Sequence, residues 1–540
     1  MNETGRDFVF HRPAMRAVST DARRGMRVRP LSLVAAAALA VVALDGHAGW
    51  PPAVYDLGAI GPGTGEIIDG PGLAAHAGMS MAGGCDVNGD GIPDIVIGAP
   101  QAGVPGGGEV YVVYGNASGA PLPASVNDAD VAIVGENDGD GLGSAMACAD
   151  FNGDGFDDLL MTAPGYSPAG YAYVVYGGAS LPNTIDLAAL GGTQGMRIPG
   201  LVSGTFFGTA AAAGDVNGDG YADIAVTAPR ASGSSSNTGQ GFVVFGGPSL
   251  PATFDLSTLN GSNGFSISST DLQGGTPNGD SIAVGDLNHD GNADVAIGSR
   301  SAFPNGLSSA GEVWVVFGKA GGFAPEIQVG TLNGGNGFAI EPAETGHFAG
   351  TSVAFVSDFN GDGHPDLVIG APATPSGPRF GTAYVVFGAT TFPAHFGLGN
   401  LDGANGVALV SPTLSDAAGS SVSGLPDLNG DRLGEVMLGA PSANAGAGGG
   451  FVVYGRRLPF PATIDLSTLN GSTGFRIDGA AAQDAAGTAV AYAGDQNRDG
   501  LYDLLIAAPF ADVNGAVNVG AIYVLFGNDL IFADGFDGTP

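Results

Sequence analysis

The sequence predicts an all-β protein, a seven-bladed β-propeller of four-stranded antiparallel blades. Three observations lead to this prediction: a nine-residue motif that recurs seven times, short β-prone segments in phase with it, and a composition poor in helix formers. Gly accounts for 96 of the 540 residues and Pro for 34, whereas Lys and Arg together number only 17. Because Gly, Pro and Asp are poor helix formers, this composition argues against a mostly helical fold. With 44% hydrophobic residues the chain can bury a core, so it is not a disordered acidic chain.

The nine-residue motif reads Asp-x-Asn-x-Asp-Gly-x-x-Asp, and its copies start 64 to 72 residues apart. They begin at Asp86, Asp150, Asp215, Asp286, Asp358, Asp427 (with departures) and Asp495. A run that ends in Tyr-Gly or Phe-Gly closes each unit, at 112–115, 174–177, 243–246, 315–318, 385–388, 452–455 and 524–527. The period is too long for a solenoid turn, and a unit of about 68 residues with a thin core would fold poorly alone. A closed ring of seven units is therefore favoured over a linear solenoid or an array of small domains.

The unit at 326–389 illustrates the strands. Its β-branched and aromatic segments are Phe338–Ile340, Ser352–Val356, Leu367–Ile369 and Tyr384–Phe387, and Gly, Pro and Asn separate them. Such segments predict four strands, and the short loops between them predict antiparallel pairing. The blades are placed at 54–116, 124–178, 185–247, 254–319, 326–389, 396–456 and 464–528, which together form a propeller domain at 54–528.

The first 48 residues have the pattern of a leader with a signal peptide. Four Arg residues between 23 and 29 precede a 14-residue apolar run, Leu31–Leu44, and small residues precede a cleavage position after Ala48. The alternative is a membrane anchor, but a spanning helix needs about 20 apolar residues. We therefore expect a protein that is secreted or held at the cell surface or in the periplasm, with no transmembrane segment in the mature chain. Residues 529–540 form a short C-terminal tail.

The chain contains two cysteines, Cys85 and Cys148, at or near the end of the same predicted strand in adjacent repeats. An exported protein can form disulfides, so a bridge between the repeats and a pair of buried thiols both remain open.

The nine-residue motif has the chemistry of a calcium loop. Side-chain oxygens at positions 1, 3, 5 and 9 and the backbone carbonyl of position 7 offer only oxygen ligands, which favours Ca²⁺ over Zn²⁺ or Cu²⁺. Gly at position 6 permits the sharp bend. Up to seven Ca²⁺ ions are predicted. The ligand sets are Asp86, Asn88, Asp90, Ile92 and Asp94; Asp150, Asn152, Asp154, Phe156 and Asp158; Asp215, Asn217, Asp219, Tyr221 and Asp223; Asp286, Asn288, Asp290, Asn292 and Asp294; Asp358, Asn360, Asp362, His364 and Asp366; Asp427, Asn429, Asp431, Leu433 and Glu435; and Asp495, Asn497, Asp499, Leu501 and Asp503.

Two other interpretations of these loops fit the sequence less well. An EF-hand needs Glu at position 12, where all seven loops have an apolar residue: Ile97, Met161, Val226, Ile297, Ile369, Leu438 and Ile506. Turn preference alone explains Asp, Asn and Gly in one loop, but not three carboxylates in each of seven. The sixth loop, 427–435, has Arg432 in place of Gly and Glu435 at position 9, so we expect it to be the weakest site or empty.

The acidic balance restricts the partners. Acids outnumber bases 52 to 17, for a net charge of −35, which argues against nucleic-acid binding. Three carboxylates in each of seven loops account for 21 of the 52 acids, so much of the charge belongs to the predicted cation sites.

With these motifs the sequence resembles the FG-GAP repeat family, the seven-bladed propeller of integrin α subunits. Phe-Gly occurs at 245–246, 317–318 and 387–388, and Gly-Ala-Pro at 98–100, 370–372 and 439–441. The resemblance implies Ca²⁺ in loops on one face and partner binding on the other. The single Lys319 against 16 Arg, with abundant Ala and Gly, indicates a high-GC bacterial genome.

No catalytic constellation is evident. The sequence has neither an HExxH nor a GxSxG motif, and many acids belong to the nine-residue loops. We therefore predict a non-catalytic binding or adhesion module for a protein or glycan ligand. The alternative is a propeller enzyme, a polysaccharide lyase or hydrolase or a phospholipase-like protein, with its site near the propeller axis.

Overall fold

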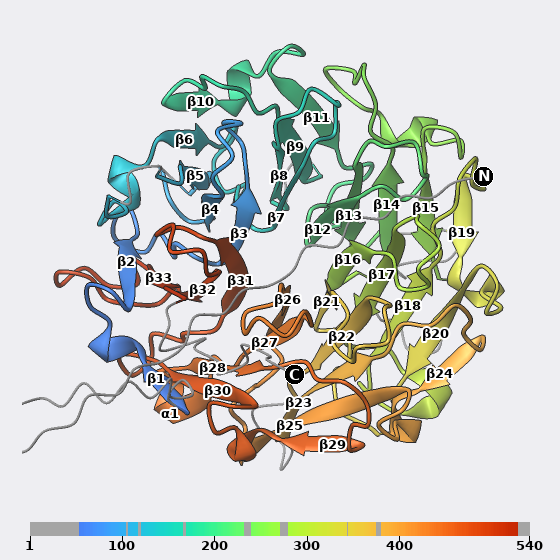
Figure 1. Cartoon of the computed structure of the whole chain (residues 1–540). Coiled ribbons are helices and arrows are strands. Elements are labelled where there is room, and N and C mark those ends of the chain that lie inside the picture. The colour runs from blue at the N-terminus through green and yellow to red at the C-terminus, as the bar shows by residue number, and fades with distance from the viewer. Residues whose placement is uncertain are drawn as a thin grey trace, which may run out of the picture. The chain divides into compact units, whose positions relative to one another are not determined.

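The computed structural model describes residues 53–103, 106–116, 120–165, 169–231, 239–269, 279–342, 344–373 and 380–527. The predicted leader at 1–48 and tail at 529–540 lie outside the described residues. The described chain forms seven β-sheets, the blades of the propeller (Figure 1).

Each blade is a meander of four antiparallel strands that starts from an inner strand. From the inner strand outward, blade 1 contains β3 Ser80–Cys85, β4 Asp94–Ala99, β5 Glu109–Val113 and β6 Val131–Val134. Blade 2 contains β7 Met146–Ala149, β8 Asp158–Ala163, β9 Tyr171–Val175 and β11 Gly195–Pro199. Blade 3 contains β12 Ala211–Gly214, β13 Asp223–Ala228, β14 Gln240–Val244 and β15 Gly264–Ser268. Blade 4 contains β16 Ser281–Gly285, β17 Asp294–Ser299, β18 Glu312–Val316 and β20 Gly337–Glu341.

The remaining three blades follow the same order. Blade 5 contains β21 Ser352–Val356, β22 Asp366–Ala371, β23 Phe380–Val386 and β25 Gly406–Leu414. Blade 6 contains β26 Ser421–Leu425, β27 Glu435–Gly439, β28 Gly449–Val453 and β30 Gly474–Asp478. Blade 7 contains β31 Ala489–Gly494, β32 Asp503–Ala508, β33 Ala521–Leu525 and β2 Gly65–Asp69.

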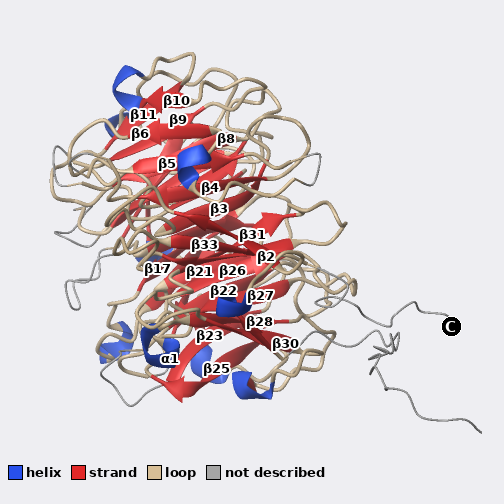
Figure 2. Ribbon diagram, turned by 90° about the vertical axis from the view of Figure 1, so that its left-hand side faces the viewer, coloured by secondary structure: helices blue, strands red, loops and turns tan. Residues whose placement is uncertain are grey.

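The inner strands close a ring. Each of β3, β7, β12, β16, β21, β26 and β31 contacts the next, and β31 contacts β3 (Figure 1). Seen from the side, the described chain consists almost entirely of strands and loops (Figure 2). The predicted seven-bladed β-propeller is confirmed.

Five of the described sheets carry a fifth strand, which the four-stranded prediction did not include. It pairs parallel to the outermost strand of its blade, as β29 does with β25. The fifth strands are β10 Thr184–Asp186, β19 Glu326–Gln328, β24 His395–Gly397, β29 Thr463–Asp465 and β1 Val54–Asp56. Four of these strands come from the connection between the third and fourth strands of the following blade, which lies against its neighbour before it returns. The remaining one, β1, precedes β2 at the beginning of the described chain.

Helical structure is confined to single turns among the described residues. The 3₁₀ turns are η1 Leu57–Ala59, η2 Val126–Asp128, η3 Leu187–Ala189, η4 Leu256–Thr258, η5 Pro304–Gly306, η6 Val329–Thr331, η7 Leu398–Asn400 and η8 Leu466–Thr468, and the one short helix is α1 Ala443–Gly446. An Asp before several turns caps them, as where Asp465 accepts a hydrogen bond from the Ser467 N–H (2.9 Å). No helix within the described part of the chain has the length and apolar character needed to cross a membrane.

A unit of the sequence repeat and a blade do not comprise the same residues, because the first strand of each unit belongs to the preceding blade. The segment Phe338–Ile340, which opens the unit at 326–389 in sequence, lies in β20 and forms the outermost of the four strands of blade 4. The same offset closes the ring, because β2 from the beginning of the described chain pairs antiparallel with β33 near its end. The first described strand, β1, pairs with β30 of blade 6.

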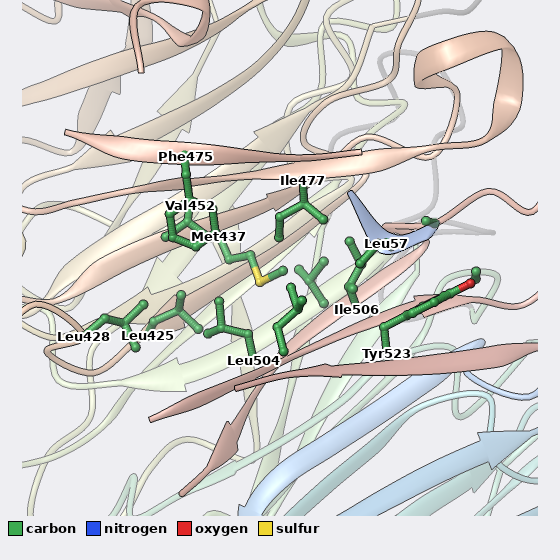
Figure 3. Close-up of a cluster of buried hydrophobic side chains, with 14 of the residues drawn as sticks. Leu57, Leu425, Leu428, Met437, Val452, Phe475, Ile477, Leu504, Ile506 and Tyr523 are labelled. Carbon is green, nitrogen blue, oxygen red and sulfur yellow. The ribbon is translucent and has the colours of Figure 1, made fainter. Parts of the chain in front are cut away.

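The hydrophobic core lies between neighbouring blades. Blades 6 and 7 bury Met437, Val452 and Phe475 from one sheet against Leu504 and Ile506 from the other (Figure 3). Six more clusters repeat this arrangement between the other described blades. Both faces of each sheet are therefore buried, because each blade has a neighbour on either side.

The glycines of the two dipeptide signatures are required by close packing. A Cβ on Gly388, which follows Phe387, would collide with the Pro365 carbonyl oxygen of the nine-residue loop. A Cβ on Gly370, in Gly370-Ala371-Pro372, would collide with the Gly419 carbonyl oxygen at the next blade. One glycine thus lets the loop pack against the end of the third strand, and the other lets the blades approach each other.

Cys85 and Cys148 form a disulfide, which decides between the two interpretations left open by the sequence. The bond joins the inner strands β3 and β7 of adjacent blades, with the Cα atoms 5.9 Å apart.

Removing this disulfide is expected to destabilise the propeller, because the bond closes a segment of 63 residues in the unfolded chain. The double variant Cys85→Ala/Cys148→Ala should lose about 2–4 kcal/mol of the free energy of unfolding, measured by denaturant titration. Reductant should lower the stability of the wild type toward that of the variant and leave the variant unchanged. If reductant leaves the midpoint of the wild-type unfolding transition unchanged, this prediction is wrong.

Candidate metal loops

All seven nine-residue loops join an inner strand to the second strand of its blade. The loop in blade 5, for example, runs from the end of β21 to the start of β22. Because this connection lies at the same end of every blade, the loops lie together on one face of the ring, the metal-loop face. The residues at position 12 belong to the second strands, as predicted from their apolar character.

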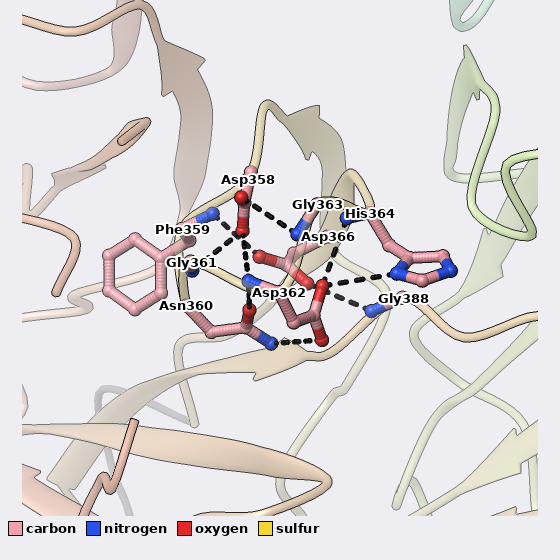
Figure 4. A network of polar contacts seen from close by, with 9 residues as sticks. All are labelled: Asp358, Phe359, Asn360, Gly361, Asp362, Gly363, His364, Asp366 and Gly388. Carbon is pink, nitrogen blue, oxygen red and sulfur yellow. Dashed lines mark hydrogen bonds and ion pairs between the residues drawn. The ribbon is translucent and has the colours of Figure 1, made fainter. Parts of the chain in front are cut away.

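The loop of blade 5 shows how the motif folds (Figure 4). The carboxylate of Asp358, at position 1, accepts hydrogen bonds from the N–H groups of positions 4, 5 and 6 (2.6, 2.9 and 2.8 Å). The Asn360 Oδ1 accepts from the Asp362 N–H (2.8 Å), and the Asp362 Oδ1 accepts from the His364 N–H (2.9 Å). The side chains at positions 1, 3 and 5 therefore turn inward, toward one another.

Positions 4 and 6 take the left-handed backbone conformation in all seven loops, with φ between 56° and 91°. Gly adopts this conformation without a Cβ clash, whereas other residues are strained in it. Three of these positions lack Gly: His289 and Arg498 at position 4, and Arg432 at position 6. His289 is exposed and lies edge-on to His364 of the next loop, with ring centroids 5.4 Å apart.

The carboxylate at position 9 is fully buried in every loop. In blade 5, the Asp366 Oδ2 accepts from the Phe359 N–H at position 2 (2.8 Å), and its Oδ1 accepts from the Gly388 N–H after the third strand (2.8 Å). The second bond recurs in six blades, donated by Gly115, Gly177, Gly246, Gly318, Gly388 and Gly527. Position 9 thus ties the loop to the end of the third strand in addition to its predicted role as a ligand.

The hydrogen bond from the closing glycine N–H was not predicted from the sequence. In the sequence, the Tyr-Gly and Phe-Gly endings serve only as markers of the repeat. Their constant phase with position 9, about 20 residues earlier, is the signal that could have identified the pair, because a buried carboxylate needs donors.

Burial raises the pKa of the position-9 carboxylates. It does so to about 7 for Asp94, Asp158, Asp223 and Asp503, and to about 8 for Asp294 and Asp366. The two backbone donors oppose this rise, and the acids at positions 1 and 5 add to it. A nearby cation would offset both the burial and the repulsion.

This shift predicts the pH dependence of the calcium-free protein. A carboxyl whose pKa is higher in the folded state binds its proton more tightly there, so its contribution to stability is lost as pH rises through the folded pKa. The melting temperature in chelator should therefore fall between about pH 5 and about pH 8. Scanning calorimetry across this range tests the prediction, and a melting temperature that rises with pH would contradict it.

The sixth loop keeps the fold of the others. Arg432 has φ 70°, and its N–H donates to Asp427 (2.7 Å) as the glycine N–H does at this position elsewhere. In the longer side chain of Glu435, Oε2 accepts a hydrogen bond from the Leu428 N–H (2.8 Å), while Oε1 is buried without a hydrogen-bond partner among the described residues.

The carboxylates of the sixth loop also lie closest together. Asp427, Asp431 and Glu435 each place one oxygen within 4.8 Å of the other two, the one such acidic group found within the described chain. The strain at Arg432 predicts weak binding, whereas the gathered carboxylates and the unpartnered oxygen suit a cation. The ranking of this loop as the weakest site stays a prediction.

The residues present suit Ca²⁺. Each loop presents inward-turned carboxylate and amide oxygens at positions 1, 3 and 5, and a buried carboxylate at position 9 adjoins them. These oxygens are hard donors, in a number that Ca²⁺ accommodates with the backbone carbonyl of position 7 and water. The aromatic side chains at position 7 have a separate contact, since Phe156 and Tyr221 lie over Gly89 and Gly153 of the preceding loop.

Comparison with known proteins agrees with this architecture. The sequence model of the FG-GAP repeat family matches residues 77–113, 142–175, 207–245, 278–316 and 349–386, which lie in blades 1 to 5. Phosphatidylinositol-glycan-specific phospholipase D of Rattus norvegicus is 33% identical over 176 residues, which are 31% of this chain and 20% of the relative. Integrin alpha-5 of Xenopus laevis is 28% identical over 237 residues, 43% of this chain and 20% of the relative.

The aligned segments thus amount to about a fifth of the length of these relatives. Among solved structures, the V. cholerae biofilm matrix protein Bap1 matches 89% of this chain and 92% of its own, with 10% identity and a TM-score of 0.34. The chain therefore matches the FG-GAP repeat model in five segments and folds as a seven-bladed β-propeller.

Proposed function

We propose that the protein is an exported, calcium-binding propeller that acts as a non-catalytic binding or adhesion module. Calcium in the nine-residue loops stabilises one face, and the opposite face binds a protein or glycan partner. The observation that supports this proposal is that the loop carboxylates lie on one face, whereas most of the exposed large apolar side chains lie on the other.

Exposed apolar side chains gather opposite the metal-loop face. Eight of the twelve large hydrophobic residues that are exposed in the described chain lie at the far ends of the strands or in the connections there: Leu73, Met79, Leu201, Val202, Phe380, Leu414, Phe510 and Val517. A contiguous exposed apolar patch is typical of a protein-interaction site. Such a patch favours a protein partner over a glycan.

Two of these connections form a single surface at the point where the ring closes. The Ala74 N–H donates to the Val517 carbonyl oxygen (3.0 Å), and the His76 ring lies edge-on to Phe510, with centroids 5.0 Å apart. Leu73 is 68% exposed and Val517 is 52% exposed beside these contacts. The backbone pairing holds both side chains in place without burying them.

A catalytic role is the second candidate, because phosphatidylinositol-glycan-specific phospholipase D shares part of this sequence. The inner strands at the propeller axis contain mainly Ala, Gly, Ser and other apolar residues, including Phe355, and their titratable side chains are limited to Tyr492 and the two bridged cysteines. General acid–base or nucleophilic catalysis at the axis would need further groups there. The axis therefore favours binding over catalysis.

The test is a binding and cleavage screen on arrays of glycans and extracellular proteins, with calcium present. The variant Leu73→Ser/Val517→Ser should reduce binding at least tenfold, while Tyr502→Ser, which alters an exposed residue on the metal-loop face, should not. Since these side chains are exposed, the variants should remain folded. Unchanged binding by Leu73→Ser/Val517→Ser would overturn the partner surface, and time-dependent release of product would favour the enzyme.

A further inference from the structure

A cleft lies beside the sixth loop, on the metal-loop face. It has a volume of about 890 Å³, within the range of pockets that hold small organic ligands. Blade 6 contributes one wall through Asn429 and Asp431, and the segment from β29 to η8 contributes the other. Val453, Leu433 and Ile464 supply apolar surface between them.

The path of the chain explains the cleft. After β28 the chain turns aside along the fifth loop, where the Arg456 N–H donates to the Phe359 carbonyl oxygen (2.9 Å) and the Leu458 N–H to that of Asn360 (3.2 Å). It then adds β29 to blade 5 before it returns to blade 6 as β30. The space between β29 and the third strand of blade 6 is the cleft.

Two arginines give this cleft a positive charge that is rare in the molecule. Only ten of the 492 residues after Ala48 are basic, and four of these, Arg432, Arg456, Arg457 and Arg476, fall between 432 and 476. Arg456 and Arg457 line the cleft, are exposed, and form no ion pair with any described residue. The Arg456 guanidinium lies 4.6 Å from the centre of the Phe460 ring, which fixes its position.

The remaining lining is rich in hydroxyl and carboxylate groups. The Thr468 hydroxyl donates to the Asp465 carbonyl oxygen (2.6 Å) and the Ser472 hydroxyl to Asn470 Oδ1 (2.8 Å), so toward a ligand both act as acceptors. The Asp465 carboxylate also accepts, and Thr463 adds a further hydroxyl. A ligand that was anionic throughout would be repelled by Asp431 and Asp465. The lining therefore suits a ligand with one anionic group, several hydroxyls and an apolar face.

We propose that this cleft binds an acidic saccharide, a uronic acid unit of a glycan. Its carboxylate pairs with Arg456 and Arg457, for which the planar guanidinium is suited. Its hydroxyls bond to Asp465, Thr468 and Ser472, and the apolar face of its ring lies on Ile464. This site lies on the metal-loop face and does not depend on the apolar surface proposed above, so either can fail without the other.

Blade 4 supplies a natural comparison. The equivalent cleft there has a volume of about 430 Å³, with a single basic residue, Lys319, whose Nζ lies 4.9 Å from the centre of the Phe323 ring. Glu326 lines it where blade 6 has Thr463. We expect no acidic saccharide to bind there, because the acid replaces a neutral hydroxyl and the arginine pair is absent.

The test is titration calorimetry with a uronic acid trisaccharide and with the same trisaccharide after reduction of its carboxyl groups. The wild-type protein should bind the acidic form at least tenfold more tightly, and added salt should reduce the difference. Arg456→Gln/Arg457→Gln should abolish the preference, whereas the matched variant Lys319→Gln should keep it. Thermal melts should show both variants folded, since all three side chains are exposed.

Three outcomes would overturn the proposal: no binding of the acidic trisaccharide, equal affinity for both trisaccharides, or an unchanged preference in Arg456→Gln/Arg457→Gln. A titration in chelator tests a second explanation, in which a loop-bound cation binds the carboxylate. If the preference disappears in chelator and survives in the arginine variant, a loop-bound cation rather than the arginine pair holds the carboxylate.

Discussion

Replacement of Asp366 by Ala should destabilise the propeller strongly, whether or not calcium is present. The side chain is fully buried, and its two oxygens accept from the Phe359 and Gly388 N–H groups. Each buried N–H left without an acceptor costs about 1–3 kcal/mol, so the pair should cost about 2–6 kcal/mol. Denaturant unfolding in calcium and in chelator measures the effect.

A variant in the same loop separates the two roles of these carboxylates. Asp362, at position 5, is exposed and accepts from the local His364 N–H. Asp362→Ala should therefore lower stability mainly in the presence of calcium, because a ligand is lost, and change it little in chelator. Equal effects of Asp362→Ala in both conditions, or a negligible effect of Asp366→Ala in chelator, would show that the division between ligand and structural acid is wrong.

Chelation of calcium should lower the melting temperature of the wild-type protein by more than any single substitution. A ligand that binds the folded state at one hundred times its dissociation constant adds about 2.7 kcal/mol per site, and the chain has seven candidate sites. Without the cations, the acids at positions 1, 5 and 9 of each loop repel one another.

The measurement is differential scanning calorimetry with excess calcium and with excess chelator. Magnesium serves as the control ion, since its preference for strict octahedral geometry should let it restore less of the stability. Equal melting temperatures in calcium and chelator would contradict the assignment of the loops as metal sites.

The sequence was sufficient to predict the architecture because the repeat is strong. Seven copies of one motif at nearly constant spacing left few alternatives, and the apolar residue at position 12 correctly placed the second strand after each loop. The fifth strands were not predicted, because segments such as Thr463–Asp465 are three residues long and pair with another repeat. Periodicity within one unit carries no information on such pairing.

The offset between repeat and blade was missed for a related reason. Phe338–Ile340 has the composition of a strand, but nothing in its own sequence says whether it joins the blade before or after it. Similarly, the position of Cys85 and Cys148 in equivalent strands allowed a disulfide without requiring one. Only the distance between β3 and β7 decides this, and packing of small residues between the blades sets that distance.

Within the loops, the oxygen-bearing residues could be identified from the sequence, but the different role of each could not. Asp358 and Asp366 look equivalent in the motif, yet one organises the loop backbone and the other is buried against a distant glycine. Glu435 looked like a departure that weakens its loop, whereas its longer side chain leaves one buried oxygen unpartnered. Burial and hydrogen-bond geometry distinguish these acids, and neither can be inferred from residue type.

The most direct test of the central claim is the number of calcium ions bound by each chain, measured by equilibrium dialysis and atomic emission. Seven loops with oxygen donors at the same positions predict six or seven ions per chain, with a single weaker site if the strain at Arg432 dominates. The variant Asp427→Asn/Asp431→Asn should remove that weaker site and leave the others. A count below six in calcium well above physiological concentration would contradict the claim that the nine-residue loops are metal sites.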